Sequence, residues 1–541
     1  MPLTHTASTW IGMPTLNFCY KARYIKVGKE TEYLRTESGI IEVDTVEKEN
    51  LDSALNLMNR RGMIMPSAQI YGEVGGFYDY GPVGLKIKKR IEALWRRKLI
   101  EELGNLEIET SLIAPEQVFR ASGHLETFAD PISVCKKCGY SHRADKMLAE
   151  FYEKKNDKAR AEAAKHAKLD ELKKMILDAE LKCERCGAKL EDVEMFNLML
   201  ATKVGSLGST QSYLRPETAQ GTFLDFKNIF KIYGLKLPIG IGQSGKAFRN
   251  EISPRNILVR MREFSQMELE YFFDPEEKDL VINGKKIDES VFSNEITFAN
   301  AANGGDESVV KKVKISRLLE DGHIPNKLFG YLLYQENEFM KALGFDDDVY
   351  RFVELSKDEL PHYSKGNVDL EAKIGGKYEE LAGTAYRTDF DLKSHETLSK
   401  EDLHVFNNDK KVMPHVVEFA MGLDRTFLAL ISNSLYKDDK RGWEVLRLNN
   451  SITPYDFALF PLQRDDKLMD KSAEIRDALL KKGYSVFYSY TGSIGKRYAR
   501  ADEIGINKAL TVDYDTLNDG SVTVRDMLTT NQERIKVDRL L

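Results

Sequence analysis

The sequence predicts an α+β protein: a core built on an antiparallel sheet, a helical insert that holds a metal, and a separate C-terminal α/β domain. Two strand-like segments, one ending at Phe248 and one starting near Arg260, are joined by a long polar loop, as in an antiparallel pair. Two C-x-x-C pairs bracket a charged helical stretch. After Pro454 short strands and helices alternate, which is typical of a separate α/β unit.

The composition is that of a globular protein. The 541 residues include 79 Lys and Arg against 85 Asp and Glu, so the net charge is -6. This balance excludes a uniformly basic nucleic-acid coat protein but permits local basic patches. With 42% hydrophobic residues the chain can bury a large core, which excludes disorder. No apolar run approaches the length of about 20 residues that a membrane span needs, so we expect no membrane association.

Cysteine use favours a reducing compartment. Four of the five cysteines form two close pairs, and Cys19 is left over. Such pairs indicate metal ligation rather than disulfide stapling, so a cytoplasmic location is expected. Residues 1–29 contain no Asp or Glu but four basic residues, which faintly suggests a transit peptide. Residues 1–45 are therefore a genuine extension, a transit peptide or a mis-assigned start.

The first part of the core is predicted from periodicity. Residues 46–61 are expected to form a short amphipathic helix. Apolar residues at three- and four-residue spacing predict a long helix over 83–103, which Gly104 ends. Alternation over 106–113 predicts a strand that ends at Pro115.

The two C-x-x-C pairs are Cys135 with Cys138 and Cys183 with Cys186, each followed by Gly. Four thiolates satisfy a tetrahedral structural zinc and leave no open position for catalysis. The alternative is four unligated thiols. The residues between the pairs, 145–182, are rich in Lys, Glu and Ala and predict a projecting helical arm. The zinc-binding insert is placed at about 131–190, and a second insert, a small subdomain, at about 275–325.

Charged residues recur on the two strand-like segments of the core. Arg249 and Glu251 end the first, and Arg262 and Glu268 lie on the second. Planar guanidinium groups suit phosphate, and carboxylates suit an amine. A third segment, 414–430, is an apolar strand interrupted by one Glu, then a Gly turn into a helix with an Arg in its first turn. Each segment alone is compatible with an exposed strand or a capped helix.

Together these segments resemble the signature motifs of class II aminoacyl-tRNA synthetases. Arg249 with Arg262-Glu-Phe264 is similar to the second motif, and Gly422-Leu-Asp-Arg425 to the third. The helix at 83–103 with the following strand resembles the first, which forms the dimer interface in that class. Further segments resemble the homodimeric type of glycyl-tRNA synthetase from about residue 55 onward: Tyr71 to Pro82, Ser122-Gly-His124, His142 to Asp145, Arg215 to Gly221, Arg387 to Leu392 and Gly495 to Gly505.

The resemblance implies a class II catalytic domain over 46–454 and an anticodon-binding domain over 455–541. It implies ATP-dependent attachment of glycine to the glycine tRNA through glycyl-adenylate, by a homodimer. The partners are then ATP, glycine, the tRNA and a second copy of the chain. The charged helical stretch at 145–182 either contacts tRNA or is merely solvated.

The resemblance also implies roles for single residues. Arg249 is placed on the α-phosphate, Glu251 on the adenine amine and Arg425 on the γ-phosphate; these three are the catalytic candidates. Phe264 is expected to stack on the base, and Glu380 to bind Mg²⁺. The expected ATP-binding residues are Arg249, Asn250, Glu251, Val259, Arg260, Met261, Arg262, Glu263, Phe264, Glu380, Leu381, Gly422, Leu423, Asp424 and Arg425.

Glycine has no side chain to read, so the expected pocket is small and binds the ammonium through carboxylates. Larger amino acids are then rejected sterically, and no editing domain is needed. Where the family shows Glu-Pro-Ser, this chain has Glu418-Phe419-Ala420, which removes a hydroxyl from the amine site. The expected glycine-binding residues are Arg143, Glu217, Phe264, Ser265, Gln266, Met267, Glu268, Arg387, Glu418, Phe419, Ala420, Met421 and Gly422.

Two alternatives remain open at this stage. A synthetase-like binding protein could keep the fold and lose catalysis, but the candidate residues Arg249, Glu251, Phe264, Arg425 and Glu217 are all present. Another class II synthetase, for threonine, proline or histidine, could share the C-terminal domain. The segment Arg215-Pro-Glu-Thr-Ala-Gln-Gly221 argues against that.

Overall fold

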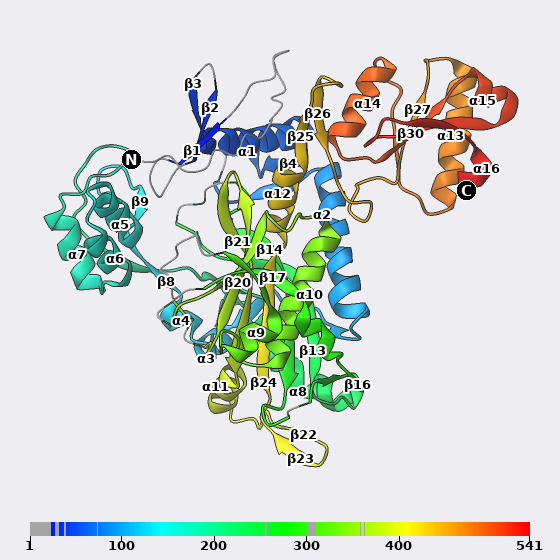
Figure 1. Cartoon of the computed structure of the whole chain (residues 1–541). Coiled ribbons are helices and arrows are strands. Elements are labelled where there is room, and N and C mark those ends of the chain that lie inside the picture. The colour runs from blue at the N-terminus through cyan, green and yellow to red at the C-terminus, as the bar shows by residue number, and fades with distance from the viewer. Residues whose placement is uncertain are drawn as a thin grey trace.

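The fold is taken from a computed structural model (Figure 1). It describes residues 23–26, 32–36, 39–72, 74–252, 254, 257–277, 279–300, 310–357, 359–361 and 363–540, with side chains from residue 51 onward. Most of the segment 1–45 therefore lies outside the described residues. Three short strands and a helix open the described chain: β1 (Arg23–Lys26), β2 (Glu32–Thr36), β3 (Gly39–Glu42) and α1 (Val43–Arg60).

A nine-stranded sheet forms the centre of the molecule, in the order β18-β17-β19-β20-β21-β24-β14-β13-β6. Within the run β19-β20-β21-β24-β14-β13 each strand is antiparallel to the next, which confirms the predicted α+β core. The pairs β17-β19 and β13-β6 are parallel. Their bounds are β6 (Leu106–Glu107), β13 (Ile239–Phe248), β14 (Glu263–Phe273), β17 (Glu295–Ala299), β18 (Lys311–Lys314), β19 (Tyr350–Glu354), β20 (Asn367–Ile374), β21 (Lys377–Thr388) and β24 (His415–Gly422).

Helices pack against this sheet (Figure 1). The helix predicted over 83–103 is α2 (Pro82–Trp95), which continues as a π-helical turn over Arg96–Glu101. A Cβ atom at Gly242 of β13 would lie only 3.1 Å from the Trp95 ring. Because glycine has no Cβ, the helix can approach the sheet closely at this point. The other helices around the sheet are α8 (Ala219–Tyr233), α9 (Ile315–Glu320), α10 (Lys327–Leu343), α11 (Phe390–Ser399) and α12 (Leu423–Ser434).

Two expectations for this region are corrected. On the apolar face of α2, Ile87, Ile91 and Trp95 are fully buried in the chain's own core and so are not available for an interface. The strand predicted over 106–113 is broken: only β6 joins the central sheet, whereas β7 (Ile113–Pro115) pairs in a second sheet. The break occurs because the backbone N–H of Thr110 is held by the Gln243 side chain instead of by a strand.

That second sheet has the order β11-β12-β7, with β11 (Leu200–Val204) and β12 (Thr210–Leu214) forming a hairpin. Strand β7 is one of its two edge strands. A smaller pair, β4 (Ile64–Pro66) and β5 (Tyr78–Tyr80), precedes α2. Two short helices follow β7, α3 (Glu116–Ala121) and α4 (His124–Thr127).

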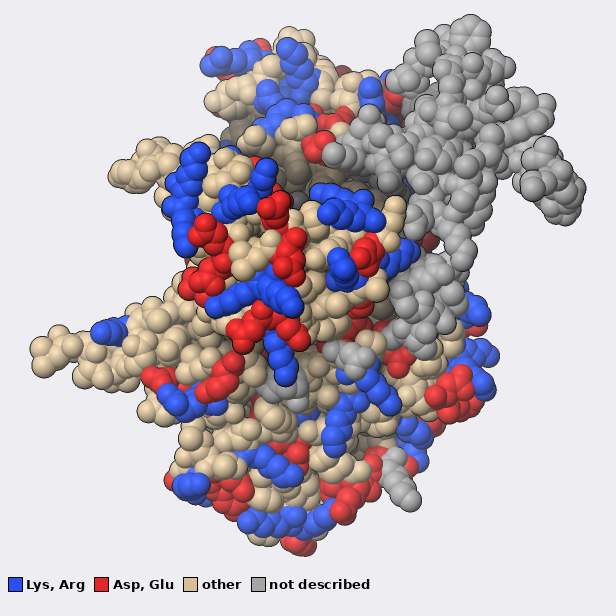
Figure 2. Space-filling view, turned by 90° about the vertical axis from the view of Figure 1, so that its left-hand side faces the viewer, with Lys and Arg blue, Asp and Glu red and all other residues tan. Residues whose placement is uncertain are grey.

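The insert between the cysteine pairs differs from the projecting arm that its composition predicted. It folds into three helices, α5 (Ala144–Lys154), α6 (Lys158–His166) and α7 (Leu169–Asp178). They lie beside a small sheet of order β10-β8-β9, formed by β8 (Ala129–Val134), β9 (Ser141–Arg143) and β10 (Glu194–Asn197). Leu148, Leu172 and Ile176 belong to a separate hydrophobic core of the insert, so its apolar residues pack against one another within the insert. On the face that includes the insert, basic and acidic side chains are interspersed (Figure 2).

The segment expected to form a small subdomain at 275–325 instead extends the central sheet. It contains the short hairpin β15 (Val281–Ile282) and β16 (Lys285–Lys286). Its strands β17 and β18 then lie at the sheet edge, where β17 pairs with β19. Phe292 and Ile296 belong to the main hydrophobic core.

The C-terminal part follows the predicted alternation. Its mixed sheet has the order β28-β27-β29-β30-β31, in which β27 is parallel to both neighbours and β30 is antiparallel to β29. The elements are β27 (Phe457–Pro461), α13 (Asp466–Lys481), β28 (Val486–Tyr488), α14 (Ile494–Glu503), β29 (Lys508–Val512), α15 (Tyr514–Asp519), β30 (Ser521–Asp526), β31 (Gln532–Lys536) and α16 (Val537–Leu540).

The C-terminal sheet is fastened to the rest of the chain. Arg60 and Arg61, at the end of α1, form ion pairs with Glu503 of α14. Asp502 accepts from Trp443 and Arg441 around the hairpin β25 (Leu435–Asp438) and β26 (Trp443–Leu446). Apolar residues on both sides of Pro454 share one core, so the two sheets are packed and not merely tethered.

Candidate active site

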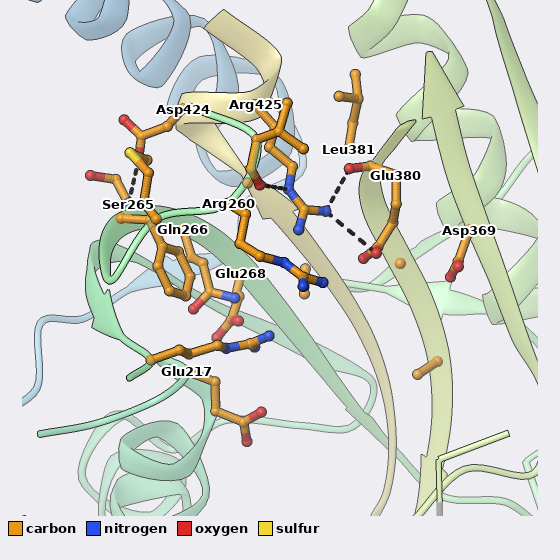
Figure 3. A pocket seen from close by; sticks show the side chains of 18 of the residues that line it. Glu217, Arg260, Ser265, Gln266, Glu268, Asp369, Glu380, Leu381, Asp424 and Arg425 are labelled. Atoms are coloured by element: carbon orange, nitrogen blue, oxygen red, sulfur yellow. Dashed lines mark hydrogen bonds and ion pairs between the residues drawn. The ribbon is translucent and has the colours of Figure 1, made fainter. Parts of the chain in front are cut away.

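A cavity of about 340 Å³ opens on the face of the central sheet, over β14, β24, β21 and β20 (Figure 3). It collects residues that lie more than 200 positions apart, from Glu217 to Arg425. Of the predicted ATP-binding residues, Arg249, Glu251, Val259, Arg260, Met261, Phe264, Glu380, Leu381, Gly422, Asp424 and Arg425 line it. Of the predicted glycine-binding residues, Glu217, Phe264, Ser265, Gln266, Glu268, Glu418, Ala420 and Gly422 line it.

Strand geometry decides which residues of each run reach the cavity. Side chains alternate between the two faces of a strand. Phe264, Gln266 and Glu268 of β14 and Glu418, Ala420 and Gly422 of β24 therefore lie on the cavity face. The predicted contributions of Met267, Phe419 and Met421 are corrected: these three are fully buried in the hydrophobic core instead.

Arg249 lies between two aromatic rings. Its guanidinium is 5.2 Å from the ring centre of Phe128 and 5.4 Å from that of Phe264, and its Nε donates to the carbonyl of Pro216 at 3.1 Å. These contacts orient a planar cation at the cavity wall, where it can receive an anionic group. The aromatic contact with Phe264 also positions that ring to stack on a base.

The loop between β13 and β14 closes one side of the cavity. Arg260 lies 3.6 Å from the Glu251 carboxylate. Arg262 instead binds backbone, donating from Nε to the carbonyl of Glu251 and from Nη1 to that of Gly75, and so does not line the cavity. Asn250 and Glu263 also lie outside the lining, because Glu263 pairs with Lys246 on the strand edge.

At the third motif, Gly422 ends β24 and α12 begins. Arg425 donates to the backbone carbonyls of Val259 at 2.9 Å and Glu380 at 2.7 Å, and it lies 3.4 Å from the Glu380 carboxylate (Figure 3). The neighbouring Asp424 has a structural role, because its carboxylate accepts hydrogen bonds from Tyr80, Lys88 and the backbone N–H of Ser265. Leu423 is buried on the other side of the sheet and does not line the cavity.

A cluster of buried carboxylates forms the inner end of the cavity. Glu217, Glu268 and Glu418 line it, and Glu270 lies behind them, directly across the sheet from Glu418. Burial and the charge of Glu268 raise the pKa of Glu270 well above its ordinary value, and neither of its oxygens has a hydrogen-bond partner among the described residues. A cation bound beside the cluster would favour the ionised form of these carboxyls.

Arg387 neutralises part of this cluster. It is fully buried, donates to Glu418 and Asp391, and lies 3.6 Å from Glu217. Burial opposes ionisation of Glu217, but His124 and Arg387 outweigh it and lower its pKa. The prediction that Arg387 binds glycine is therefore corrected, since Arg387 lies behind Glu418 and beneath the Tyr363 ring.

Arg143 is also not at this site. Its guanidinium is held by Asp130 and Asp145 at the base of the insert, and it does not line the cavity. The local sequence His-Arg-Ala-Asp explains this, because Asp145 lies in the first turn of helix α5 and receives two hydrogen bonds from Arg143. The prediction that placed Arg143 near glycine is corrected.

Sequence reasoning missed one wall of the cavity. The strands β20 and β21 and the loop before them contribute it, and no local motif marks these residues. Asp369 is notable, because burial and the charge of Glu380 raise its pKa to about 8. The residues found only in the structure are Leu258, Leu355, Pro361, Tyr363, Asn367, Asp369, Gly383 and Ala385.

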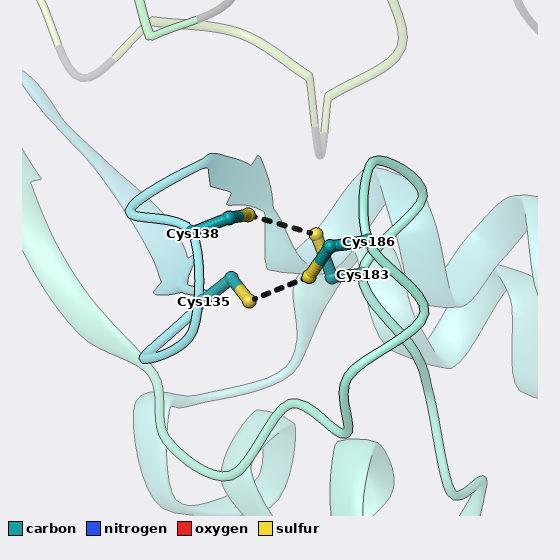
Figure 4. A group of neighbouring side chains, drawn as sticks. All are labelled: Cys135, Cys138, Cys183 and Cys186. Atoms are coloured by element: carbon teal, nitrogen blue, oxygen red, sulfur yellow. Dashed lines mark hydrogen bonds between the residues drawn. The ribbon is translucent and has the colours of Figure 1, made fainter.

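The four predicted metal ligands come together at the base of the insert. The sulfur atoms of Cys135 and Cys186 are 3.5 Å apart, those of Cys138 and Cys183 are 3.6 Å apart, and all four lie within 4.8 Å of one another (Figure 4). Four thiols at this separation fit a tetrahedral zinc set.

Comparison with known proteins agrees with the fold. Residues 203–434 match the tRNA synthetase class II core domain (G, H, P, S and T), and residues 456–541 match the anticodon binding domain. The glycine–tRNA ligase of Acetivibrio thermocellus is 37% identical over 91% of this chain and 97% of its own. That of Methanothrix thermoacetophila is 34% identical over 90% and 95%.

The chain belongs to the glycine–tRNA ligase family. The Pyrococcus horikoshii member is 35% identical over 90% of this chain and 96% of its own. A solved prolyl-tRNA synthetase from Giardia lamblia, in complex with prolyl-adenylate, has a TM-score of 0.54 at 14% identity and covers 91% of this chain and 76% of its own. That likeness shows the class II fold alone. No helix among the described residues is long and apolar enough to cross a membrane.

Proposed function

We propose that the cavity activates glycine with ATP and that the chain then transfers the glycyl group to the glycine tRNA. The observation that carries this is the pairing, in one cavity, of two guanidinium groups suited to phosphate with a buried carboxylate cluster suited to an ammonium. Family membership names the same reaction.

In the first step a carboxylate oxygen of glycine attacks the α-phosphorus of ATP, and the bond to pyrophosphate breaks. In the second, the terminal ribose hydroxyl of the tRNA attacks the glycyl carbonyl carbon and loses its proton, and AMP leaves. Arg249 stabilises the α-phosphate, Arg425 holds the γ-phosphate, and Glu251 accepts from the adenine amine while Phe264 stacks on the ring. Such catalysis depends on positioning and charge stabilisation.

Glycine is selected by charge and size. Its ammonium lies among Glu217, Glu268 and Glu418, while Arg387 holds Glu418 in place from behind. Burial raises the pKa of Glu268, and an ammonium bound beside it would favour its ionised form. Ala420 leaves the amine site without the family's usual hydroxyl.

Magnesium is proposed at Asp369 and Glu380. Both carboxylates line the cavity, and their mutual repulsion is relieved by a hard cation, which prefers oxygen ligands. When bound with ATP, Mg²⁺ neutralises phosphate charge. Asp369 is fixed by a 2.6 Å hydrogen bond from Asn367.

Other parts of the proposal concern assembly. A structural zinc is bound by Cys135, Cys138, Cys183 and Cys186 and stabilises the insert. The chain forms a homodimer, supported by the edge strand β7, where Ile113 and the preceding Leu112 are more than 40% exposed. The C-terminal domain binds the tRNA anticodon arm. A cytoplasmic location follows from the cysteine use.

Amino-acid-dependent exchange of labelled pyrophosphate into ATP tests the reaction. We expect exchange with glycine and none above background with alanine, serine, threonine or proline. Exchange with another amino acid would contradict the glycine assignment, and no exchange with any amino acid would favour a binding protein that lost catalysis.

A further inference from the structure

Three polar side chains form a chain of contacts that leads from the turn between helices α3 and α4 to the active-site cavity. The hydroxyl Oγ of Ser122 lies 2.7 Å from Nδ1 of His124. On the other side of the imidazole ring, Nε2 of His124 lies 3.5 Å from Oε2 of Glu217. The segment Ser122-Gly-His124 therefore reaches the proposed amine site, although it does not itself line the cavity.

The chain of contacts presents its carboxylate, and not its hydroxyl, to the cavity. A serine, a histidine and a carboxylate also form the triads of hydrolases, in which the serine hydroxyl attacks the substrate. Ser122 is only 2% exposed and lies outside the cavity lining, whereas Glu217 lines the inner end of the cavity (Figure 3). The group that a ligand can meet is therefore the Glu217 carboxylate, and the other two side chains lie behind it.

The imidazole ring of His124 is held in one orientation. Gly123 has a φ of 80°, in the left-handed region that favours glycine, and this turn brings the Ser122 hydroxyl to the ring. The rings of Phe128 and Phe119 lie 5.6 Å and 6.3 Å from the imidazole, both edge to face. These contacts keep Nε2 directed at Glu217.

The two oxygens of the Glu217 carboxylate have different neighbours. Gln220 donates to Oε1 at 2.8 Å, and the Arg387 guanidinium lies 3.6 Å from the same oxygen. His124 approaches the other oxygen, Oε2. The carboxylate is therefore held at both ends, and it cannot rotate without losing one of these contacts.

The contact with His124 also favours the charged form of Glu217. Burial raises the pKa of Glu217, but His124, followed by Arg387, lowers it below the ordinary value. A carboxylate binds an ammonium more strongly than a neutral carboxylic acid does. The same contact that fixes the position of Glu217 therefore also keeps it ready to receive a cation.

We propose that His124 is a positioning residue for glycine binding: its Nε2 donates to Glu217 and holds that carboxylate in place for the glycine ammonium. Ser122 donates to Nδ1, and because a neutral imidazole carries one proton, this keeps the proton on Nε2. The other acceptor near the Ser122 hydroxyl, the carbonyl of Phe119, is farther away, at 3.4 Å. The inference rests on the proposed function and adds to it a residue that does not touch the substrate.

The test is glycine-dependent pyrophosphate exchange by the full chain with substitutions at position 124. His124→Ala is expected to raise the KM for glycine about tenfold, the lower end for a hydrogen bond to a charged group, because the contact is long. The KM for ATP is expected to stay unchanged, since all the side chains that hold Arg249 are retained. His124→Gln keeps an amide N–H close to the position of Nε2 and should retain most of the glycine affinity, whereas His124→Asn, whose amide is too short, should resemble His124→Ala.

His166 offers a matched control. Its Nε2 also lies beside a glutamate, 3.1 Å from Glu162, but this pair is exposed on helix α6 of the insert. His166→Ala is therefore expected to leave the KM for glycine unchanged. An equal rise in KM in His166→Ala would overturn the assignment, because the effect would then not depend on the contact with Glu217.

A double-mutant cycle distinguishes positioning from a general effect on folding. If His124 acts through Glu217, His124→Ala should change the KM for glycine little in a chain that already carries Glu217→Gln, because the charge that His124 serves is gone. Effects of the two substitutions that simply multiply would overturn the proposal, as would an unchanged KM in His124→Ala alone. Absence of glycine-dependent exchange in the unsubstituted chain would instead overturn the proposed function, and this inference with it.

Discussion

Arg387 donates a hydrogen bond to Glu418 from behind the cavity, at a point where neither side chain is exposed to more than 7%. The guanidinium also binds Asp391 through two donors, so its position is fixed independently of any substrate. Glu418 is thereby held on the cavity face of β24, ready to receive a cation. This arrangement makes the amine site sensitive to pH.

Glycine affinity is expected to rise with pH. Burial raises the pKa of Glu418 to about 8, although Arg387 opposes the shift. Below that pKa the carboxyl is mostly protonated and binds an ammonium weakly, and above it the carboxylate binds well. The KM for glycine in pyrophosphate exchange should therefore fall as pH rises through about 8, and Glu418→Gln should raise KM and flatten the profile.

Glu336 provides the control. Burial raises its pKa to about 8 as well, but its carboxyl accepts from Thr384 on the far side of the sheet. Between the ordinary pKa of Glu and about 8, Glu336 holds a proton in the folded chain that it has lost in the unfolded chain. The folded chain therefore loses stability as pH rises through this range. Glu336→Gln should remove that loss in thermal unfolding while leaving the glycine profile unchanged. A glycine profile that flattens in Glu336→Gln would contradict the assignment to Glu418.

The motifs that lie close together in the sequence predicted the site well. Gly422 and Arg425 fall within one strand-to-helix turn, so their spacing in the sequence predicted their relative positions in the site. Asp369 and Tyr363 escaped prediction because they reach the cavity only through the pairing of β20 with β21 and of β21 with β24. Nothing in their local sequence specifies that pairing.

Periodicity also left partners undetermined. The apolar stripe on α2 correctly predicted that this face is buried, but it did not predict which surface packs against it. The chain's own sheet covers the stripe. Runs such as 264–268 were predicted whole, whereas the pleat turns Met267 into the core. The insert followed the same rule, because its apolar stripe packs within three short helices rather than along one arm.

One zinc per chain is expected from the four cysteines. Cys135→Ser should abolish zinc binding and unfold the insert, since the binding free energy of a structural metal is folding free energy. Elemental analysis measures the metal, and limited proteolysis measures the insert. Cys19→Ser is the matched control and should retain the zinc. Protein that was expressed with sufficient metal but contains no zinc would contradict the proposed zinc site.

Disrupting the edge strand β7 should dissociate the dimer. Ile113 is 44% exposed beside an unpaired strand edge, and an aspartate there would be buried without a partner in any interface. Ile113→Asp is expected to give a monomeric mass by light scattering at micromolar concentration. Leu480→Asp, at a similarly exposed leucine of α13, should remain dimeric. A fully active monomer of the unsubstituted chain would contradict the homodimer.

The last prediction concerns Glu217 and the missing hydroxyl at Ala420. Glu217 accepts from Gln220 at 2.8 Å and lies 3.5 Å from His124, so its carboxylate is fixed and its pKa is lowered despite burial. Glu217→Gln removes a charge-assisted bond to the ammonium worth about 1.5–3 kcal/mol, or roughly 10- to 150-fold in kcat/KM for glycine.

Ala420→Ser adds a neutral hydroxyl opposite Glu268 in the sheet, and a neutral hydrogen bond contributes about 1 kcal/mol, so the gain should stay below about tenfold. Both effects are measured by pyrophosphate exchange at varied glycine. The two measurements together separate two models of the amine site, one in which the charge of Glu217 binds the ammonium and one in which a hydroxyl at position 420 does. The two models predict changes in kcat/KM of different size. If Glu217→Gln leaves kcat/KM unchanged while Ala420→Ser raises it a hundredfold, the ammonium does not lie among these carboxylates.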